Sequence, residues 1–160
     1  MSFSPRDFRD CLGQFATGVA VVTTRALDGT KAGITINSFA SVSLEPALVL
    51  FSVDCRAATH DMFAGECTRF CINILRQEQQ TLSDLFSSPG QNDWDGVTYR
   101  DDCHGVPCLS DSLATFSCKR HAIHDGGDHS IIVGQVQEID LGKTGNPLLY
   151  YGGRYRGLDC

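Results

Sequence analysis

Residues 32–43 read A-G-I-T-I-N-S-F-A-S-V-S, an alternating strand that turns into hydroxyls and an amide where core residues would be expected. Successive side chains of a strand point to opposite faces, so Ile34 and Ile36 share one face. The other face carries the small and polar residues Gly33, Thr35 and Asn37. Because these polar groups would point together into one space, the stretch predicts a sheet edge that faces a ligand.

More hydroxyl residues follow before the next apolar segment, at Ser38, Ser41 and Ser43. That segment, Ala47–Val53, is almost wholly apolar, which predicts a central strand covered on both faces. Polar atoms that are removed from water need hydrogen-bond partners. A planar heteroaromatic ligand would satisfy the polar atoms of this region well.

The length and charge of the chain limit what it can be. Its 160 residues fit one domain, residues 1–160, with enough apolar sequence for a real core. Its formal net charge is −6, whereas nucleic acids and anionic membranes are bound by concentrated cationic surfaces. We therefore expect no nucleic-acid partner and no membrane partner.

Eight cysteines would suggest disulfides in a small secreted protein. The sequence, however, has no signal peptide and no apolar run of membrane-spanning length. A cytoplasmic location is therefore expected, with cysteines such as Cys71 and Cys118 kept as reduced thiols within strand-like apolar patterns.

The order of elements predicts a mostly β fold with a few short helices. Ser4-Pro5-Arg6-Asp7 is typical of a helix start with a capping box, and Gly18 is the expected end of that helix. Asp28-Gly29 predicts a hairpin, and residues 89–104 predict a loop with at most one short strand. Further helices are expected at 57–64 and 77–86, and strands at 19–24, 31–38, 47–53, 70–75, 114–123, 129–139 and 148–155. Because the strands do not alternate with long helices, a closed antiparallel barrel is favoured over a doubly wound parallel sheet.

Three local patterns leave their function open. Arg56 and Thr59 flank the start of an expected helix, whose free N–H groups attract anions, but an ordinary turn fits equally well. His129 follows a Gly126-Gly127 turn at the mouth of a strand, where it could meet a ligand, although a solvated loop histidine is the simpler interpretation. Cys118, His121 and His124 could be imagined as metal ligands, with His129 as a fourth, but strand residues three apart diverge, which favours a structural role.

Several familiar motifs are missing from the sequence. Residues 13–18 have the glycine spacing of a phosphate loop but lack its lysine and hydroxyl residue. No G-x-G-x-x-G or G-x-S-x-G motif is present, so a Rossmann glycine turn and a serine-nucleophile elbow are not expected.

Six segments, taken in order, resemble the flavin-reductase-like, FMN-binding split-barrel family, specifically the small reductase components of two-component flavin monooxygenases. They are F-R-D-C-L-G-Q-F-A-T-G-V-A-V-V-T-T (residues 8–24), G-I-T-I-N-S-F-A-S-V-S-L-E-P-A-L-V-L-F (33–51), F-C-I-N-I-L (70–75), L-S-D-L-F (82–86), G-D-H (127–129) and L-L-Y-Y-G-G-R-Y (148–155). Each segment is loose alone, but their order is specific and covers nearly the whole chain.

The resemblance implies a six-stranded antiparallel Greek-key split barrel that forms a homodimer and binds flavin near the subunit interface. The implied contacts to the isoalloxazine ring are Thr35, Asn37, Ser38 and Phe39, with Ser41 and Ser43 continuing that wall toward the ribityl chain and phosphate. The implied phosphate turn is Asp54, Arg56 and Thr59, although family members often carry serine where Ala57 or Ala58 stands. Phe86 would lie near the flavin, His129 beside the face where nicotinamide docks, and Arg154 and Tyr155 near that site.

The implied function is that of an NAD(P)H:flavin oxidoreductase, which transfers hydride from NADH or NADPH to FMN or FAD and supplies reduced flavin to a separate monooxygenase. Hydride transfer from nicotinamide to flavin is cofactor chemistry, so the protein mainly needs to stack the two rings. Two alternatives use the same barrel. One is an oxidase or substrate reductase that keeps its FMN, and the other is a non-enzymatic flavin- or haem-binding protein.

Overall fold

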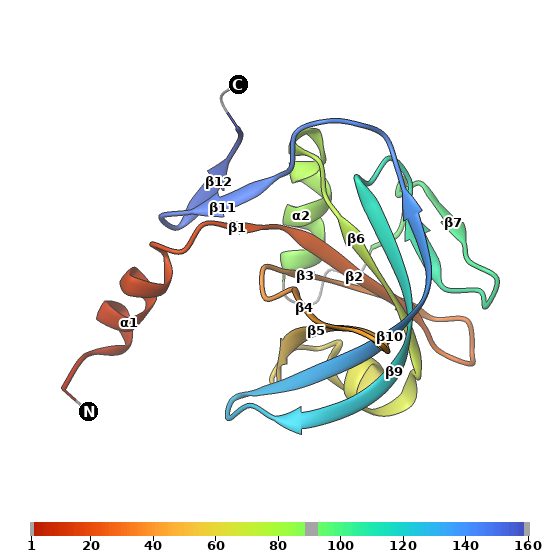
Figure 1. Ribbon diagram of the computed structural model, residues 1–160, viewed down its shortest axis with the longest axis horizontal. Coiled ribbons are helices and arrows are strands. Elements are labelled where there is room, and N and C mark those ends of the chain that lie inside the picture. Colours follow the sequence, from red (N-terminus) through yellow and green to blue (C-terminus); the bar gives the residue numbers. More distant parts are fainter. Residues whose placement is uncertain (1, 89–92, 159–160) are drawn as a thin grey trace.

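In the computed structural model, which describes residues 2–88 and 93–158, most of the chain is antiparallel β-structure (Figure 1). The helices are α1 (Pro5–Leu12), the π-helix η1 (Met62–Glu66), the 3₁₀ helix η2 (Gln77–Gln79) and α2 (Gln80–Ser87). The strands are β1 (Thr17–Gly18), β2 (Ala20–Arg25), β3 (Lys31–Ile36), β4 (Ala40–Leu44), β5 (Ala47–Asp54), β6 (Arg69–Ile74), β7 (Tyr99–Asp101), β8 (Pro107–Leu109), β9 (Ala114–Asp125), β10 (His129–Leu141), β11 (Leu149–Tyr151) and β12 (Arg154–Arg156). No helix within the described ranges is long and apolar enough to cross a membrane.

The main sheet of the described chain has seven strands in the order β3-β2-β6-β9-β10-β5-β4, and all neighbouring pairs are antiparallel. The predicted mostly β, antiparallel fold is confirmed. The predicted number of six strands is wrong for this sheet, because residues 40–44, expected to be a ligand wall, themselves form β4. The predicted closure is also wrong, since the edge strands β3 and β4 are joined by residues 37–39 and are not paired with each other.

Two small sheets complete the described fold, one of β1, β11 and β12 and one of β7 and β8. Residues 148–155, expected to be a single strand, form the β11–β12 hairpin. Gly152 and Gly153 make the turn with φ angles of +60° and +77°, which glycine adopts without steric cost. The described part of residues 89–104, predicted to be a loop with at most one short strand, contains one short strand, β7, which pairs with β8 farther along the chain; residues 89–92 lie outside the described residues.

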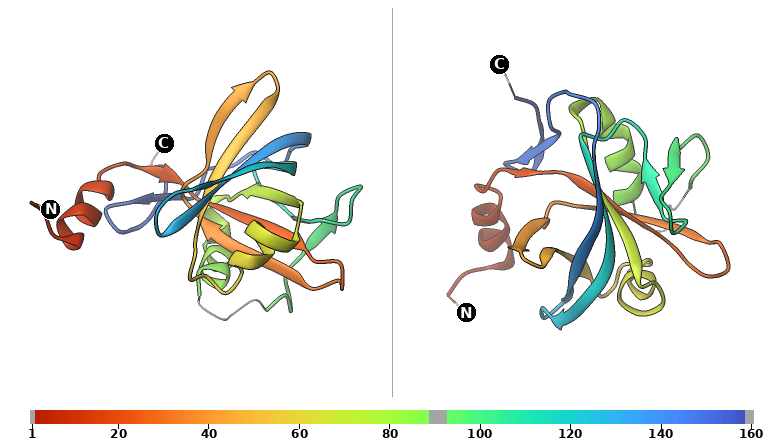
Figure 2. Two further views of the ribbon diagram at one scale, coloured as in Figure 1. Left: turned by 90° about the horizontal axis from the view of Figure 1, so that it is seen from below. Right: turned by 45° about the vertical axis from the view of Figure 1, so that its right-hand side comes forward.

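β5 was expected to be covered on both faces, but it buries only one. Val49, Phe51 and Val53 are buried, whereas the residues between them are partly exposed. The reason is that β5 pairs with the edge strand β4, and their hairpin stands out from the rest of the sheet (Figure 2). The described chain therefore supplies no layer for the outer face of this hairpin.

The two larger of three apolar clusters in the described chain hold the fold together. The first lies inside the curved sheet and contains Phe51, Phe63, Phe70 and Ile132, with Ile36 buried and Ile34 packed against it as their alternation predicts. The second lies between the sheet and α2, which packs on β2 and β3. Its buried members are Val19, Val21, Leu75, Phe86, Leu109 and Leu148.

The N-terminal helix confirms its predicted start but not its end. Ser4 and Asp7 form the expected capping box, whereas the helix stops at Leu12 with Gly13 as its C-cap, not at Gly18. None of the α1 residues is buried, and the helix projects from the sheet (Figure 1). It is attached at its end, where Gly152 N–H donates to the Gly13 carbonyl at 2.9 Å. The helix is thus an arm with an exposed apolar surface.

The helix expected at residues 57–64 is displaced. Residues 55–59 form turns, and the π-helix η1 follows at Met62–Glu66. The guanidinium of Arg120 donates to the carbonyls of Phe63, Gly65 and Cys67 at 3.0–3.3 Å and so satisfies the end of this helix. This stabilisation comes from β9, which local sequence does not reveal.

Gly33 has a packing role that can be tested. A Cβ added there would lie 2.5 Å from the ring of Phe86, so Gly33→Ala must displace that buried ring or β3. We expect a loss of about 1–3 kcal/mol in the free energy of unfolding, measured by urea denaturation. Gly18→Ala is the matched control, because a Cβ at Gly18 has no neighbour within 4 Å. Equal stability of the two variants would contradict this account of Gly33.

Candidate functional site

The candidate site begins at residues 37–39, which connect the two edge strands β3 and β4. The Ser38 hydroxyl accepts a hydrogen bond from Ser52 N–H at 2.9 Å and lies 3.4 Å from the Ser52 carbonyl. Ser52 lies on β5, two residues before Asp54, a separation of about 7 Å along a strand. One side chain therefore fixes the polar end of β3 beside the last residues of β5.

The polar face of β3 is only partly open. Gly33 lies against Phe86, and the Thr35 hydroxyl donates to the Ser83 carbonyl on α2 at 2.7 Å. Ser83 also shares a 2.8 Å hydrogen bond with the hydroxyl of Tyr155, whose pKa is raised by burial. From Thr35 onward the face borders a cavity of about 270 Å³, which is lined by Val19, Thr35, Ile36, Asn37, Ser87, Tyr150 and Tyr155.

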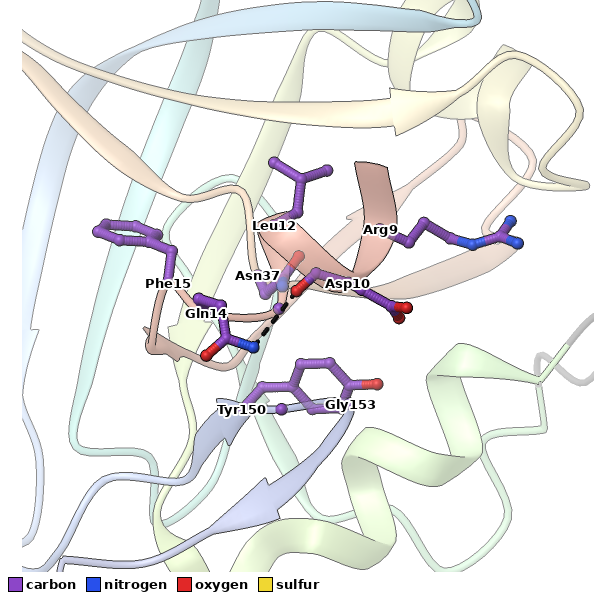
Figure 3. A pocket seen from close by; sticks show the side chains of 10 residues that line it. Arg9, Asp10, Leu12, Gln14, Phe15, Asn37, Tyr150 and Gly153 are labelled. Atoms are coloured by element: carbon purple, nitrogen blue, oxygen red, sulfur yellow. Dashed lines mark hydrogen bonds between the residues drawn. The ribbon is translucent and has the colours of Figure 1, made fainter. Parts of the chain in front are cut away.

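A second cavity, of about 450 Å³, adjoins the first because Asn37 and Tyr150 line both. Its other walls are α1 with the residues after it, including Gln14 and Phe15, and the Gly152-Gly153 turn. In Figure 3 Tyr150 lies below the end of α1 and Asn37 lies behind it. Asn37 thus stands between a small aromatic-lined space and a larger space beside the N-terminal arm.

The turn after β5 is organised by an ion pair. The Asp54 carboxylate accepts from the Arg56 backbone N–H at 2.8 Å and from its guanidinium at 3.1 and 2.8 Å. These hydrogen bonds hold the pKa of Asp54 well below its usual range and raise that of Arg56. The Arg56 side chain is still 83% exposed, so the guanidinium N–H groups not bound to Asp54 face solvent.

The rest of this turn offers unpaired donors. Within the described part of the chain, the N–H groups of Ala58 and Thr59 and the Thr59 hydroxyl make no hydrogen bond. Backbone N–H groups at a turn, together with an arginine, suit the oxygens of a phosphate. The alanines at 57 and 58 give this turn no further hydroxyl.

His129 lies beside this turn, because it opposes Asp54 in the β10–β5 pairing. Its Nδ1 lies 2.7 Å from the Asp128 carboxylate, which favours a proton on Nδ1 and leaves Nε2 as an acceptor. Its side chain is 41% exposed. The ring is therefore held by its neighbour and accessible to a ligand.

The structure brings some predicted site residues together and separates others. Asp54, Arg56, Thr59 and His129 form one group, and Thr35, Asn37 and Tyr155 form another beside the cavities. Ser38 connects the two groups through Ser52 on β5. Arg154 is exposed on β12 and carries no ion pair among the described residues.

The remaining predicted contacts differ from expectation in position. Ser41 and Ser43 pair with Val49 and Leu48, so within one chain β4 runs away from Arg56, opposite to the expected direction. Phe39 packs against the first core cluster, 5.6 Å from Phe116, and Phe86 is a buried member of the second. Phe86 is therefore covered by its neighbours, whereas Phe39 remains partly exposed.

The sequence did not reveal several polar residues that contact or adjoin the predicted site residues. They are Ser52, Ser83, Tyr150, His60 and Ser130. A signal existed for Ser83, because it falls beside Leu82, Leu85 and Phe86 in a helix whose apolar face was expected to be buried. The others gain their neighbours from β-pairing between distant segments.

The imagined metal ligands do not converge. Cys118 is buried in the first core cluster, where burial raises its pKa to about 12, whereas His121 and His124 are exposed. Residues 2–88 and 93–158 contain no group of three or more histidine, cysteine or acidic side chains that could hold a metal ion.

Comparison with known proteins identifies the family of this chain. The flavin reductase like domain matches residues 12–159, which is nearly the whole chain. The chain belongs to the flavin reductase-like family.

Three relatives illustrate the match. The reductase subunit HsaB of a flavin-dependent monooxygenase from Rhodococcus jostii is 39% identical over 99% of this chain and 80% of its own length. The NADH-dependent FMN reductase SmoA from Agrobacterium fabrum is 43% identical over 94% of this chain and 84% of its own. The solved structure of the NADH:FAD oxidoreductase SgcE6 from Streptomyces globisporus, in complex with NAD and FAD fragments, superposes with a TM-score of 0.89 at 31% identity, covering 98% of this chain and 95% of that one.

Family membership confirms three predictions from the sequence. The resemblance to the flavin-reductase-like family is correct. The enzyme class, a nicotinamide-dependent flavin reductase, is correct, and so are its reactants, a flavin and a nicotinamide donor.

Proposed function

We propose that this chain transfers hydride from NADH or NADPH to FMN or FAD and passes the reduced flavin to a separate monooxygenase. One observation supports the proposal: the Ser52 N–H donates to the Ser38 hydroxyl and so joins the end of β3 to β5, whose last residue, Asp54, binds Arg56 and opposes His129. A ring seat, an anion-binding turn and a histidine are the three parts that a flavin and a nicotinamide donor require together. The names of relatives such as SmoA and HsaB support the same reaction and the same type of partner.

Each part of this surface has a distinct role in the proposed reaction. A bound flavin supplies the hydride acceptor, so the protein contributes binding and orientation. Thr35 and Asn37 line the ring seat, with Tyr150 and Tyr155 on its other wall, and Ser38 anchors the end of β3 to Ser52. Arg56 and the Thr59 donors hold the phosphate, and His129 orients the nicotinamide ring through Nε2. Alignment of two rings at reacting distance accounts for a large part of the rate.

The Arg56 assignment predicts a difference between flavins. Arg56→Ala should weaken binding of FMN or FAD about 5- to 10-fold, because it removes charged hydrogen bonds to phosphate at an exposed position. Binding of riboflavin, which has no phosphate, should change less than about twofold. Fluorescence titration of the three flavins measures these affinities.

Arg100→Ala is the matched control for this test. Arg100 is also exposed and ion-paired, to Asp140 at 2.8 Å, but it lies away from the proposed surface. We expect it to leave all three affinities unchanged. Equal losses for riboflavin, FMN and FAD in the Arg56 variant would contradict phosphate binding at this turn.

The activity itself is tested by mixing the purified protein with NADH or NADPH and with riboflavin, FMN or FAD. We expect rapid oxidation of the nicotinamide with turnover of free flavin, followed by absorbance at both bands. A yellow protein that keeps its FMN through the cycle would instead indicate an oxidase or substrate reductase. Absence of nicotinamide oxidation with every flavin would indicate a non-enzymatic flavin- or haem-binding protein.

We further propose that the chain forms a single domain and acts as a homodimer. The exposed apolar side chains support the dimer, since Phe8, Leu12 and Phe15 on the arm are 52–77% exposed and Leu44 on β4 is 95% exposed. Apolar groups gathered on two projecting elements suit the surface of a second copy. Sedimentation velocity that gives only monomer would contradict this proposal.

A cytoplasmic location is proposed as well, and the free thiols of the described cysteines support it.

A further inference from the structure

A second histidine lies behind the proposed site, and nothing in the proposed reaction yet uses it. His60 directly follows Thr59 at the phosphate turn, and its Nε2 lies 3.0 Å from the hydroxyl of Ser130 on β10. Its Nδ1 lies 3.1 Å from the Asp61 carboxylate. The side chain is only 19% exposed. His60 therefore connects the turn after β5 to the residue next to His129.

The two contacts of His60 fit one tautomer of its ring. When Nδ1 carries the proton and donates to the Asp61 carboxylate, Nε2 is left as an acceptor. The Ser130 hydroxyl then donates to Nε2. Cys55 strengthens the same junction, because its N–H donates to the Asp128 carbonyl at 3.0 Å and its Sγ lies 4.0 Å from the Ser130 hydroxyl. The turn and the first residues of β10 thus form one connected unit.

The strand geometry separates the roles of the two histidines. His129 and Ser130 are consecutive residues of β10, so their side chains point to opposite faces. His60, which binds Ser130, therefore acts from the face opposite to His129. It cannot share the nicotinamide contact, and its effect must pass through the position of the strand.

We propose that His60 is a positioning residue that couples phosphate binding at the turn to the placement of His129. This inference rests on the proposed function. Phosphate held by the Thr59 donors fixes the turn, the turn fixes His60, and the His60–Ser130 bond fixes the start of β10. Such a coupling acts in both directions, so an ordered donor site also strengthens flavin phosphate binding.

The first test measures oxidation of NADH or NADPH with two different acceptors, FMN and riboflavin. In the wild type, kcat/KM for NADH or NADPH should be higher with FMN as the acceptor than with riboflavin. His60→Ala should reduce the ratio of these two kcat/KM values about fivefold. Ser130→Ala should reduce it equally, and the double variant should lose no more than either single one. His60→Gln keeps a side-chain hydrogen bond to Ser130 and should restore most of the ratio. His104→Ala, at an exposed turn between β7 and β8, is the control and should leave the ratio unchanged.

Hydrogen exchange gives a second measurement that does not depend on catalysis. Addition of FMN should slow amide exchange at residues 127–133 in the wild type, and His60→Ala should lose most of that protection although FMN still saturates the protein. Equal protection in the two proteins, or fully additive kinetic losses in the double variant, would overturn the inference. If no nicotinamide is oxidised but FMN protects 127–133 only when His60 is present, the proposed reaction fails while the coupling stands.

Discussion

Replacement of His129 by alanine is expected to lower kcat/KM for NADH or NADPH oxidation about 100-fold, while flavin affinity changes less than about threefold. The ring is held by Asp128 at 2.7 Å and reaches solvent opposite Asp54, and under the proposed function its loss removes the group that orients the donor. Misplacement of a reacting ring by about 1 Å can cost a factor of this size. Stopped-flow reduction of flavin and equilibrium flavin titration give the two quantities separately.

His124→Ala is the control for the His129 experiment. His124 is an exposed histidine on β9, opposite Ile131 of β10, and it carries no hydrogen bond within the described residues. It should leave the rate and the flavin affinity unchanged. A His129 variant that binds flavin much more weakly but reduces it at the normal rate would show that the histidine contacts flavin instead of the donor.

Replacement of Asn73 by leucine is expected to destabilise the protein by about 3 kcal/mol or more. The side chain is fully buried, donates to the Val21 carbonyl at 2.9 Å and to the Thr23 hydroxyl at 3.1 Å, and accepts from Leu109 N–H at 2.8 Å. Leucine removes these bonds and leaves buried partners unsatisfied, each at a cost of about 1–3 kcal/mol. Thermal denaturation should show a fall of about 6–12 °C in Tm.

Asn146→Leu provides the comparison for this experiment. The Asn146 amide makes a single 3.5 Å contact to the Leu158 carbonyl at an exposed position, so its loss should change stability by less than about 0.5 kcal/mol. If both leucine variants unfold at the wild-type temperature, the buried network around Asn73 does not stabilise β2, β6 and β8 as the hydrogen bonds indicate.

Sequence was sufficient for those parts of the fold that depend on neighbouring residues. The Ser4–Asp7 capping box, the Asp28-Gly29 hairpin and the alternation of Ile34 and Ile36 all concern groups within a few positions of one another. Each pattern has one physically favourable structure, so local chemistry determines it.

Sequence was insufficient where a distant segment decides the environment. Residues 40–44 become β4 only because β5 pairs with them, and the hydroxyls at Ser41 and Ser43 consequently run away from Arg56. Phe86 is buried because Gly33, on another element, leaves room for its ring. The place of His60 beside Ser130 likewise depends on the β5–β10 pairing, which joins residues about seventy positions apart.

The Asp54–Arg56 ion pair has a consequence for how long a product stays bound. The carboxylate already neutralises the guanidinium and occupies some of its N–H groups, and the side chain remains open to water. Under the proposed function, a flavin phosphate meets an arginine that is already ordered. It shares the charge of the guanidinium with Asp54 and remains open to water. Pre-ordering favours fast capture, and shared charge favours a short residence time. An enzyme that must hand its reduced flavin to another protein needs both rates to be high.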